Sequence, residues 1–268
     1  MLKAANVEGT KWALSLASLS RPKWFHYVST LSITGNSGAA VQETHPLLPA
    51  DQISGGYASS KWVADRLVQL ALPTCPNVSI LRPGAVFGDS ETGACNTEDT
   101  VCRLVKGCLE LGLAPHVPEA VLALTPVDYV AKAIVALSLA SADADDAQPK
   151  GTTFQIYHLT NDTAPSSAFT WNDLFSWMID NKYAISIIPH GEWISKLAAS
   201  SDNAAYALLP VLGDPSSWGS PQFDTSITDS ALAPSGVTCP RVNDKLLRNF
   251  FTFLHRSGFL GELPPDCF

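Results

Sequence analysis

A tyrosine and a lysine four positions apart, Tyr57 and Lys61, are the residues of this sequence best suited to acid–base chemistry. On a helix, positions i and i+4 lie on the same face, so the lysine ammonium would stand beside the tyrosine hydroxyl. A nearby positive charge stabilises the phenolate and lowers the tyrosine pKa from about 10 toward neutrality. Such a tyrosine exchanges a proton with a carbonyl oxygen while hydride moves at the carbon. The alternative is a surface tyrosine beside a solvated lysine.

Hydroxyl side chains follow the first predicted strand. Residues 24–29 are rich in aromatic and β-branched side chains, a composition typical of a strand, and Ser29 and Thr30 stand at its end. In open α/β sheets, ligands bind at the carboxyl ends of parallel strands. A hydroxyl at this edge can donate a hydrogen bond to the same oxygen that Tyr57 serves. The alternative is a threonine that bonds only within its own turn.

A proline and a glycine end the second predicted strand. This strand covers 78–82 and stops at Pro83 and Gly84. Both residue types let a backbone approach a planar ligand closely at the same edge of the sheet. A plain strand-ending turn is the alternative.

Helical and strand-like patterns alternate along the first part of the chain, which predicts an α/β fold with a parallel sheet. The predicted helices are 2–19, 57–72, 101–111 and 126–139, and the predicted strands are 24–29, 78–82 and 154–158. An acidic link at 142–151 precedes the third strand. The remainder is mainly helical, with a helix at 171–181, short helices and loops between 200 and 240, and a closing helix at 242–256.

The composition limits the class of protein. The chain has 268 residues, 46% of them hydrophobic, and a net charge of −8, so we expect a folded protein that binds neither nucleic acid nor an anionic membrane. No apolar run reaches the roughly 18 residues of a membrane span. The six cysteines form no C-x-x-C pair, so we expect no metal site. Without an apolar signal-like N-terminus, we expect reduced thiols and a cytoplasmic location.

Four ordered motifs resemble the extended short-chain dehydrogenase/reductases. They are Asn6-Val7-x-Gly9-Thr10, Val28-Ser29-Thr30, Tyr57-x-x-x-Lys61 and Leu81-Arg82-Pro83-Gly84. The stretches 25–32, 56–64, 88–93 and 103–108 are similar to terminal thioester reductase domains, which end carboxylic acid reductases, α-aminoadipate reductases and fungal nonribosomal-peptide-synthetase-like enzymes. The specific match covers 2–128 and is looser beyond. The resemblance implies an incomplete Rossmann-like sheet in 1–158 and a smaller, mainly helical substrate lobe in 159–268.

The resemblance also implies a reaction. NADPH gives hydride to an acyl thioester carried on the phosphopantetheine arm of a carrier domain, and an aldehyde, or after a second hydride an alcohol, is released. Tyr57 and Thr30 would bond to the developing oxyanion. Lys61 would hold the nicotinamide ribose and lower the Tyr57 pKa, and Asn6 would hold a water near Lys61. The implied cofactor contacts are Ser29, Tyr57, Lys61, Pro83, Gly84 and Val86.

One motif of the family is missing from this sequence. Members begin their fold with a strand and a G-x-x-G-x-x-G turn that cradles the pyrophosphate, and no such glycine spacing occurs here. We therefore expect the chain to be the C-terminal part of such a reductase and to bind NADPH weakly or not at all alone. The alternatives are a non-catalytic remnant that binds a partner, another extended short-chain reductase or epimerase, and a thiol enzyme built on Cys95, Cys102 or Cys108.

Overall fold

The computed structural model describes residues 2–20, 23–34, 40–44, 47–53, 55–145, 153–161, 164, 166–214 and 218–262. The chain divides into two compact units, each assembled from three separate segments. The first unit contains Met1–Val86, Asp128–Asn161 and Pro221–Cys239, and the second contains Phe87–Val127, Asp162–Ser220 and Pro240–Phe268. The expected boundary at residue 158, between a cofactor-binding part and a substrate lobe, stays a prediction. It divides the chain by function, whereas these units are divided by compactness.

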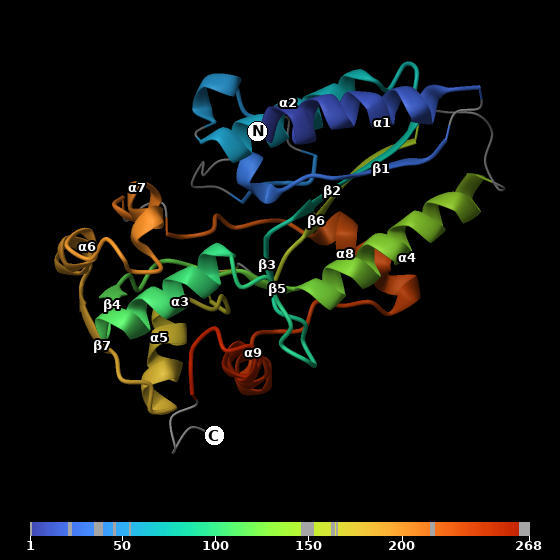
Figure 1. The fold of residues 1–268 in the computed structure, drawn as a ribbon. Helices are drawn as coiled ribbons and strands as arrows, with labels where there is room; N and C mark the ends of the chain where they lie inside the picture. The colour runs from blue at the N-terminus through green and yellow to red at the C-terminus, as the bar shows by residue number, and fades with distance from the viewer. Residues whose placement is uncertain are drawn as a thin grey trace. The chain divides into compact units, whose positions relative to one another are not determined.

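A three-stranded parallel sheet forms the centre of the first unit (Figure 1). Its strand order is β1-β2-β6, with Val28 paired to Leu81 and Pro83 paired to Leu159. These are the three strands that the sequence predicts, and their carboxyl ends meet at one edge. The elements of this unit are η1 (Ala4–Glu8), α1 (Gly9–Ser18), β1 (Phe25–Val28), η2 (Leu31–Ile33), η3 (Ala50–Gln52), α2 (Gly56–Leu70), β2 (Asn77–Pro83), α4 (Val127–Asp145), β6 (Thr153–Leu159), α8 (Ser226–Leu232) and η6 (Ala233–Ser235).

Helices cover both faces of this sheet, and alternate strand residues bury against them. Figure 1 shows α1 and α2 over one face and α4 with α8 over the other. On β2, Ile80 packs with the α1 and α2 side chains, whereas the next residue, Leu81, packs with α4 and α8. Because strand side chains alternate between faces, a strand covered on both sides needs apolar residues at successive positions. The predicted α/β class is therefore confirmed.

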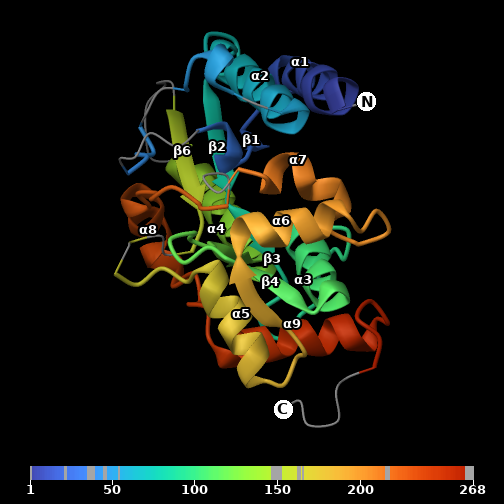
Figure 2. The same ribbon diagram turned by 90° about the vertical axis from the view of Figure 1, so that its left-hand side faces the viewer.

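The second unit is mainly helical (Figure 2). It has its own apolar core. A two-stranded parallel sheet of β4 and β7 lies within it. Its elements are α3 (Thr100–Leu111), β4 (Leu113–His116), β5 (Leu124–Pro126), α5 (Trp171–Asp180), β7 (Ser186–Pro189), α6 (His190–Ala198), η4 (Tyr206–Leu208), α7 (Leu209–Leu212) and α9 (Asp244–Arg256), and β3 (Ala85–Phe87) carries the chain from the first unit into the second.

Short strands account for most of the differences from the predicted elements. β4, β5 and β7 have only three or four residues, and each contains a proline, which removes a strand hydrogen-bond donor and argues against a strand in the sequence. α4 is also longer than predicted, because it runs to Asp145 and takes in part of the expected link. Among the described residues, no helix is both long and apolar enough to cross a membrane.

A buried glutamate joins a loop of the first unit to β6 and α8. Glu43 is 1% exposed, and its carboxylate accepts hydrogen bonds from the backbone N–H groups of His158, Ile227 and Thr228 and from the Thr228 hydroxyl. Burial raises the pKa of this carboxyl, and the hydrogen bonds act in the opposite direction. Four oriented donors thus hold this buried carboxyl group.

Gly93 lets a loop of the second unit lie directly against α9. Its φ is +72°, and a Cβ at this position would come 2.0 Å from the backbone oxygen of Asn249. We expect Gly93→Ala to lower the free energy of unfolding by about 1–2 kcal/mol through its positive φ and by a further ~1–3 kcal/mol through overpacking. The control is Gly258→Ala, because Gly258 has a φ of +74° and open space around it. Equal losses for the two variants in urea unfolding would contradict the close-contact argument.

Candidate active site

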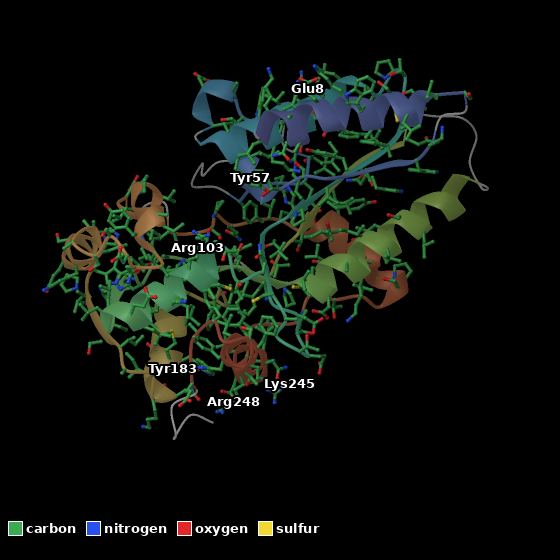
Figure 3. All side chains as sticks on the ribbon, viewed as in Figure 1. Glu8, Tyr57, Arg103, Tyr183, Lys245 and Arg248 are labelled. Carbon is green, nitrogen blue, oxygen red and sulfur yellow. The ribbon has the colours of Figure 1, made fainter. Side chains whose placement is uncertain are left out.

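α2 places Tyr57 and Lys61 one helical turn apart at its amino-terminal end. Tyr57 is labelled in Figure 3. The Tyr57 side chain is 51% exposed, which leaves it open to a ligand. The Lys61 Nζ donates a 2.7 Å hydrogen bond to the carbonyl oxygen of Val28, the last residue of β1. It also lies 4.7 Å from the centre of the Tyr27 ring. The ammonium is therefore fixed at the carboxyl edge of the sheet.

The surroundings of Lys61 lower its pKa. Burial lowers the pKa of Lys61, while the negative charge of Asp65, one turn further along α2, acts to raise it. An ammonium carries three donors, and the bond to Val28 uses one of them. Lys61 thus keeps donor capacity for a hydroxyl group of a ligand.

Thr30 caps the short turn that follows β1. Its Oγ1 accepts a 3.2 Å hydrogen bond from the backbone N–H of Ser32 and lies 3.1 Å from the Ser32 hydroxyl. The local-turn alternative is therefore met. Thr30 accepts in the bond from the Ser32 N–H, and either oxygen can donate in its contact with the Ser32 hydroxyl, so the Thr30 O–H can turn to a ligand when Ser32 donates. The turn itself, η2, packs against α2, so the Thr30 segment and the helix that bears Tyr57 are neighbours.

Asn6 lies in a π-helical turn and contacts α2. The backbone N–H of Gly9 bonds to the carbonyl of Ala4, five residues back, and such wider turns occur frequently at functional sites. The Asn6 side-chain amide donates to the Ser60 hydroxyl at 3.0 Å, and that hydroxyl donates to the carbonyl of Tyr57 at 2.8 Å. Asn6 is thus linked to the turn of α2 between Tyr57 and Lys61, and its role with a water remains a prediction.

Asp65 ties together three of the segments that carry the predicted site residues. It is fully buried and accepts from the Ser29 hydroxyl at 2.6 Å, which joins α2 to the end of β1. Arg82, at the end of β2 and 1% exposed, donates to both Asp65 carboxylate oxygens at 3.1 and 3.2 Å. Gln69 completes the set with a 2.8 Å bond. A buried pair with two parallel hydrogen bonds stabilises both charges and also fixes the orientation of the two side chains.

The predicted cofactor contacts differ in what they present to solvent. Ser29 is 4% exposed and its hydroxyl donates to Asp65, so the Ser29 side chain is not presented to a ligand. The bond instead anchors the backbone next to Thr30. Pro83 is buried, and the Gly84 N–H bonds to the carbonyl of Leu159 on β6 at 2.9 Å. Val86, two residues further, is 40% exposed and offers an apolar side chain to a ring.

An apolar hollow of about 640 Å³ opens between the start of α2 and the first helical turns of the chain. It is lined by Leu2, Lys3, Val7, Gly56, Ser59, Ser60 and Val63. Tyr57 is not among the lining residues, so the hollow is not assigned to the reacting group.

The structure brings Lys61 to the end of β1 and places Tyr57 and Thr30 on adjoining elements. Sequence reasoning misses Asp65 and Ser60, which hold these elements in place. The available signal for Asp65 is its spacing, since it follows Lys61 by four residues and shares its helix face. The arrangement can supply two hydroxyl donors and one ammonium to a carbonyl-containing ligand.

The sequence also matches known proteins. Residues 1–134 match the NAD-binding family described as male sterility protein. The chain is 30% identical over 286 residues to the L-2-aminoadipate reductase large subunit of Eremothecium gossypii, which covers 97% of this chain and 20% of that protein. The resemblance to terminal reductase domains is thereby confirmed.

Two solved structures share the fold. The terminal R domain from the myxalamid PKS-NRPS pathway is 37% identical, with a TM-score of 0.85 over 98% of this chain and 65% of that domain. The reductase domain of a nonribosomal peptide synthetase from Mycobacterium tuberculosis is 26% identical, with a TM-score of 0.78 over 97% of this chain and 66% of that domain. The chain spans 20–26% of the length of the first curated relatives it matches.

Proposed function

Because the chain belongs to the male sterility protein family of NAD-binding domains, we propose that it carries the catalytic residues of an NADPH-dependent thioester reductase. The substrate class is an acyl thioester on the phosphopantetheine arm of a carrier domain, and the product is an aldehyde. The observation that carries the proposal is the position of the Lys61 ammonium. It lies 2.7 Å from the carbonyl oxygen of Val28 at the end of β1 and one helical turn from the half-exposed Tyr57. A cytoplasmic location fits the free thiols of the described cysteines.

The residues at the sheet edge fit the nicotinamide end of the cofactor. Lys61 retains donors for the ribose hydroxyls, and the exposed Val86 side chain offers an apolar surface for the ring. When bound, the nicotinamide supplies hydride. A hydride on the thioester carbon turns the carbonyl oxygen into an oxyanion, which is the charge that the protein must stabilise.

Tyr57 and Thr30 act on that oxygen. The Tyr57 hydroxyl donates its proton to the oxyanion, and the Lys61 charge stabilises the phenolate that remains. The Thr30 O–H gives a second hydrogen bond to the same oxygen. The carbon–sulfur bond then breaks, the new hydroxyl gives up its proton to the leaving sulfur, the aldehyde and the thiol are released, and Tyr57 takes back one proton from solvent. One hydride and one proton are consumed for each thioester.

Binding of NADPH to this chain alone is expected to be weak. The sequence holds no G-x-x-G-x-x-G turn, and such a turn with its helix N-terminus binds the pyrophosphate. We expect calorimetric titration of the chain with NADPH to give no binding at micromolar cofactor. A micromolar dissociation constant would show that the described residues hold the cofactor without that turn.

The reductase proposal is tested with a chimera. The part of the myxalamid R domain that this chain does not cover is joined to the chain, and NADPH oxidation is followed with an acyl-pantetheine thioester. We expect oxidation that depends on the thioester, with aldehyde as product. A chimera that is folded and binds NADPH but reduces no acyl thioester would contradict the proposal and favour a non-catalytic remnant. Activity with a nucleotide sugar instead would favour the epimerase alternative.

A further inference from the structure

Two cysteines of the second unit lie close together, outside the residues assigned to reduction. The sulfur atoms of Cys95 and Cys102 are 3.7 Å apart, and both thiols are free. Cys95 is in the loop before α3, and Cys102 is in the first turn of that helix. A disulfide has a sulfur–sulfur distance of about 2.05 Å, so the two sulfurs must approach each other by roughly 1.6 Å to form the bond.

The chain on either side of the pair is held in place. Before Cys95, the loop is closed by hydrogen bonds from the Gly93 N–H to the Asp89 carbonyl and from the Asp89 N–H to the Ala94 carbonyl. After it, Asp99 caps α3 by accepting from the Val101 N–H at 3.0 Å. Hydrogen bonds therefore hold the backbone on both sides of the pair, and this local structure keeps the two sulfurs close together. A disulfide forms only between cysteines whose backbone places them in such proximity.

The two thiols differ in access and in proton affinity. Cys95 is partly exposed, whereas Cys102 is 2% exposed. The hydrogen bond with Cys102 lowers the pKa of Cys95, against the opposing effects of burial and of the Asp99 charge. The same bond and burial raise the pKa of Cys102. A partly exposed thiol with a lowered pKa beside a second thiol is the arrangement of peroxide-sensitive cysteine pairs.

We propose that Cys95 and Cys102 are a reversible oxidation site, in which Cys95 reacts first with a peroxide and Cys102 resolves the product. The Cys95 thiolate attacks one oxygen of hydrogen peroxide, the O–O bond breaks, and Cys95 becomes a sulfenic acid. The other oxygen leaves as hydroxide and takes up a proton to become water. The Cys102 sulfur then attacks the Cys95 sulfur, forms the disulfide and releases the hydroxyl group as water. One peroxide is reduced to two waters while two thiols are oxidised. An external thiol reverses the step.

Peptide mapping of the native chain tests the site. The chain is treated with hydrogen peroxide, free thiols are alkylated, and a protease that cleaves after glutamate separates Thr92–Glu98 from Asp99–Glu110. We expect these two peptides to be joined, with a mass about 2 Da below their sum, and to separate after treatment with dithiothreitol. Cys75 falls in a different fragment, Thr44–Glu91.

Variants identify the sulfurs and their order. The link is expected to persist in Cys108→Ser, which removes the other cysteine of Asp99–Glu110, and to vanish in Cys102→Ala, where dimedone would trap the sulfenic acid on Cys95. A link to Cys108, no link, or accumulation of Cys95 sulfinic acid in the wild type would overturn the proposal. So would an equal rate of linkage in denaturing urea, because the fold would then contribute nothing. The wild-type mapping decides the matter even where a variant does not fold.

Discussion

Tyr57→Phe is expected to lower the rate of thioester reduction by about 10²–10⁴-fold, the usual contribution of a positioned general acid. Phenylalanine keeps the ring but removes the proton that the oxyanion takes. Because Tyr57 is half exposed, loss of its hydroxyl creates no unpaired group in the core. We therefore expect the free energy of unfolding to stay unchanged. The measurement is the rate of NADPH oxidation by the chimera with an acyl-pantetheine thioester.

A second tyrosine provides the matched control for this prediction. Tyr206 is 38% exposed and lies in η4 of the second unit, outside the residues assigned to reduction. Tyr206→Phe is expected to keep full activity. If Tyr57→Phe retained the wild-type rate under conditions where chemistry limits turnover, Tyr57 would not be the proton donor.

Asp65→Asn is expected to lower the free energy of unfolding by about 3–5 kcal/mol, as for other buried ion pairs that lose one partner. The variant removes the negative charge that faces the buried Arg82 guanidinium and replaces one of its two acceptor oxygens by an amide nitrogen. It also weakens the bond from Ser29, so the ends of β1 and β2 lose their common anchor to α2. Urea unfolding measures the loss of stability.

Two further variants separate the charge effect from a general effect of the substitution. Asp51→Asn changes an exposed aspartate of η3 and is expected to be nearly neutral. Adding Arg82→Met to Asp65→Asn removes the stranded charge and is expected to recover part of the loss. A double variant no more stable than Asp65→Asn would mean that the stranded charge is not the source of the cost.

Local patterns were sufficient for the elements that build the first sheet. The β1, β2 and β6 strands and the helices α1 and α2 follow from apolar spacing and strand composition, because their backbone hydrogen bonds and exposed faces repeat with periods that a sequence displays. The Tyr57–Lys61 pair belongs to the same class, since a single helix fixes its geometry. Proline-containing strands such as β7 do not, because their existence depends on a partner strand.

By itself, the sequence determined the α/β class, the parallel strands and the shared helix face of Tyr57 and Lys61. Only the tertiary structure decided which polar groups are buried together. Ser29 meets Asp65 across 36 positions, and Glu43 meets Thr228 across 185. The reason is physical: a buried charge is tolerated only where donors from distant segments converge on it, and such convergence leaves no periodic signal along the chain.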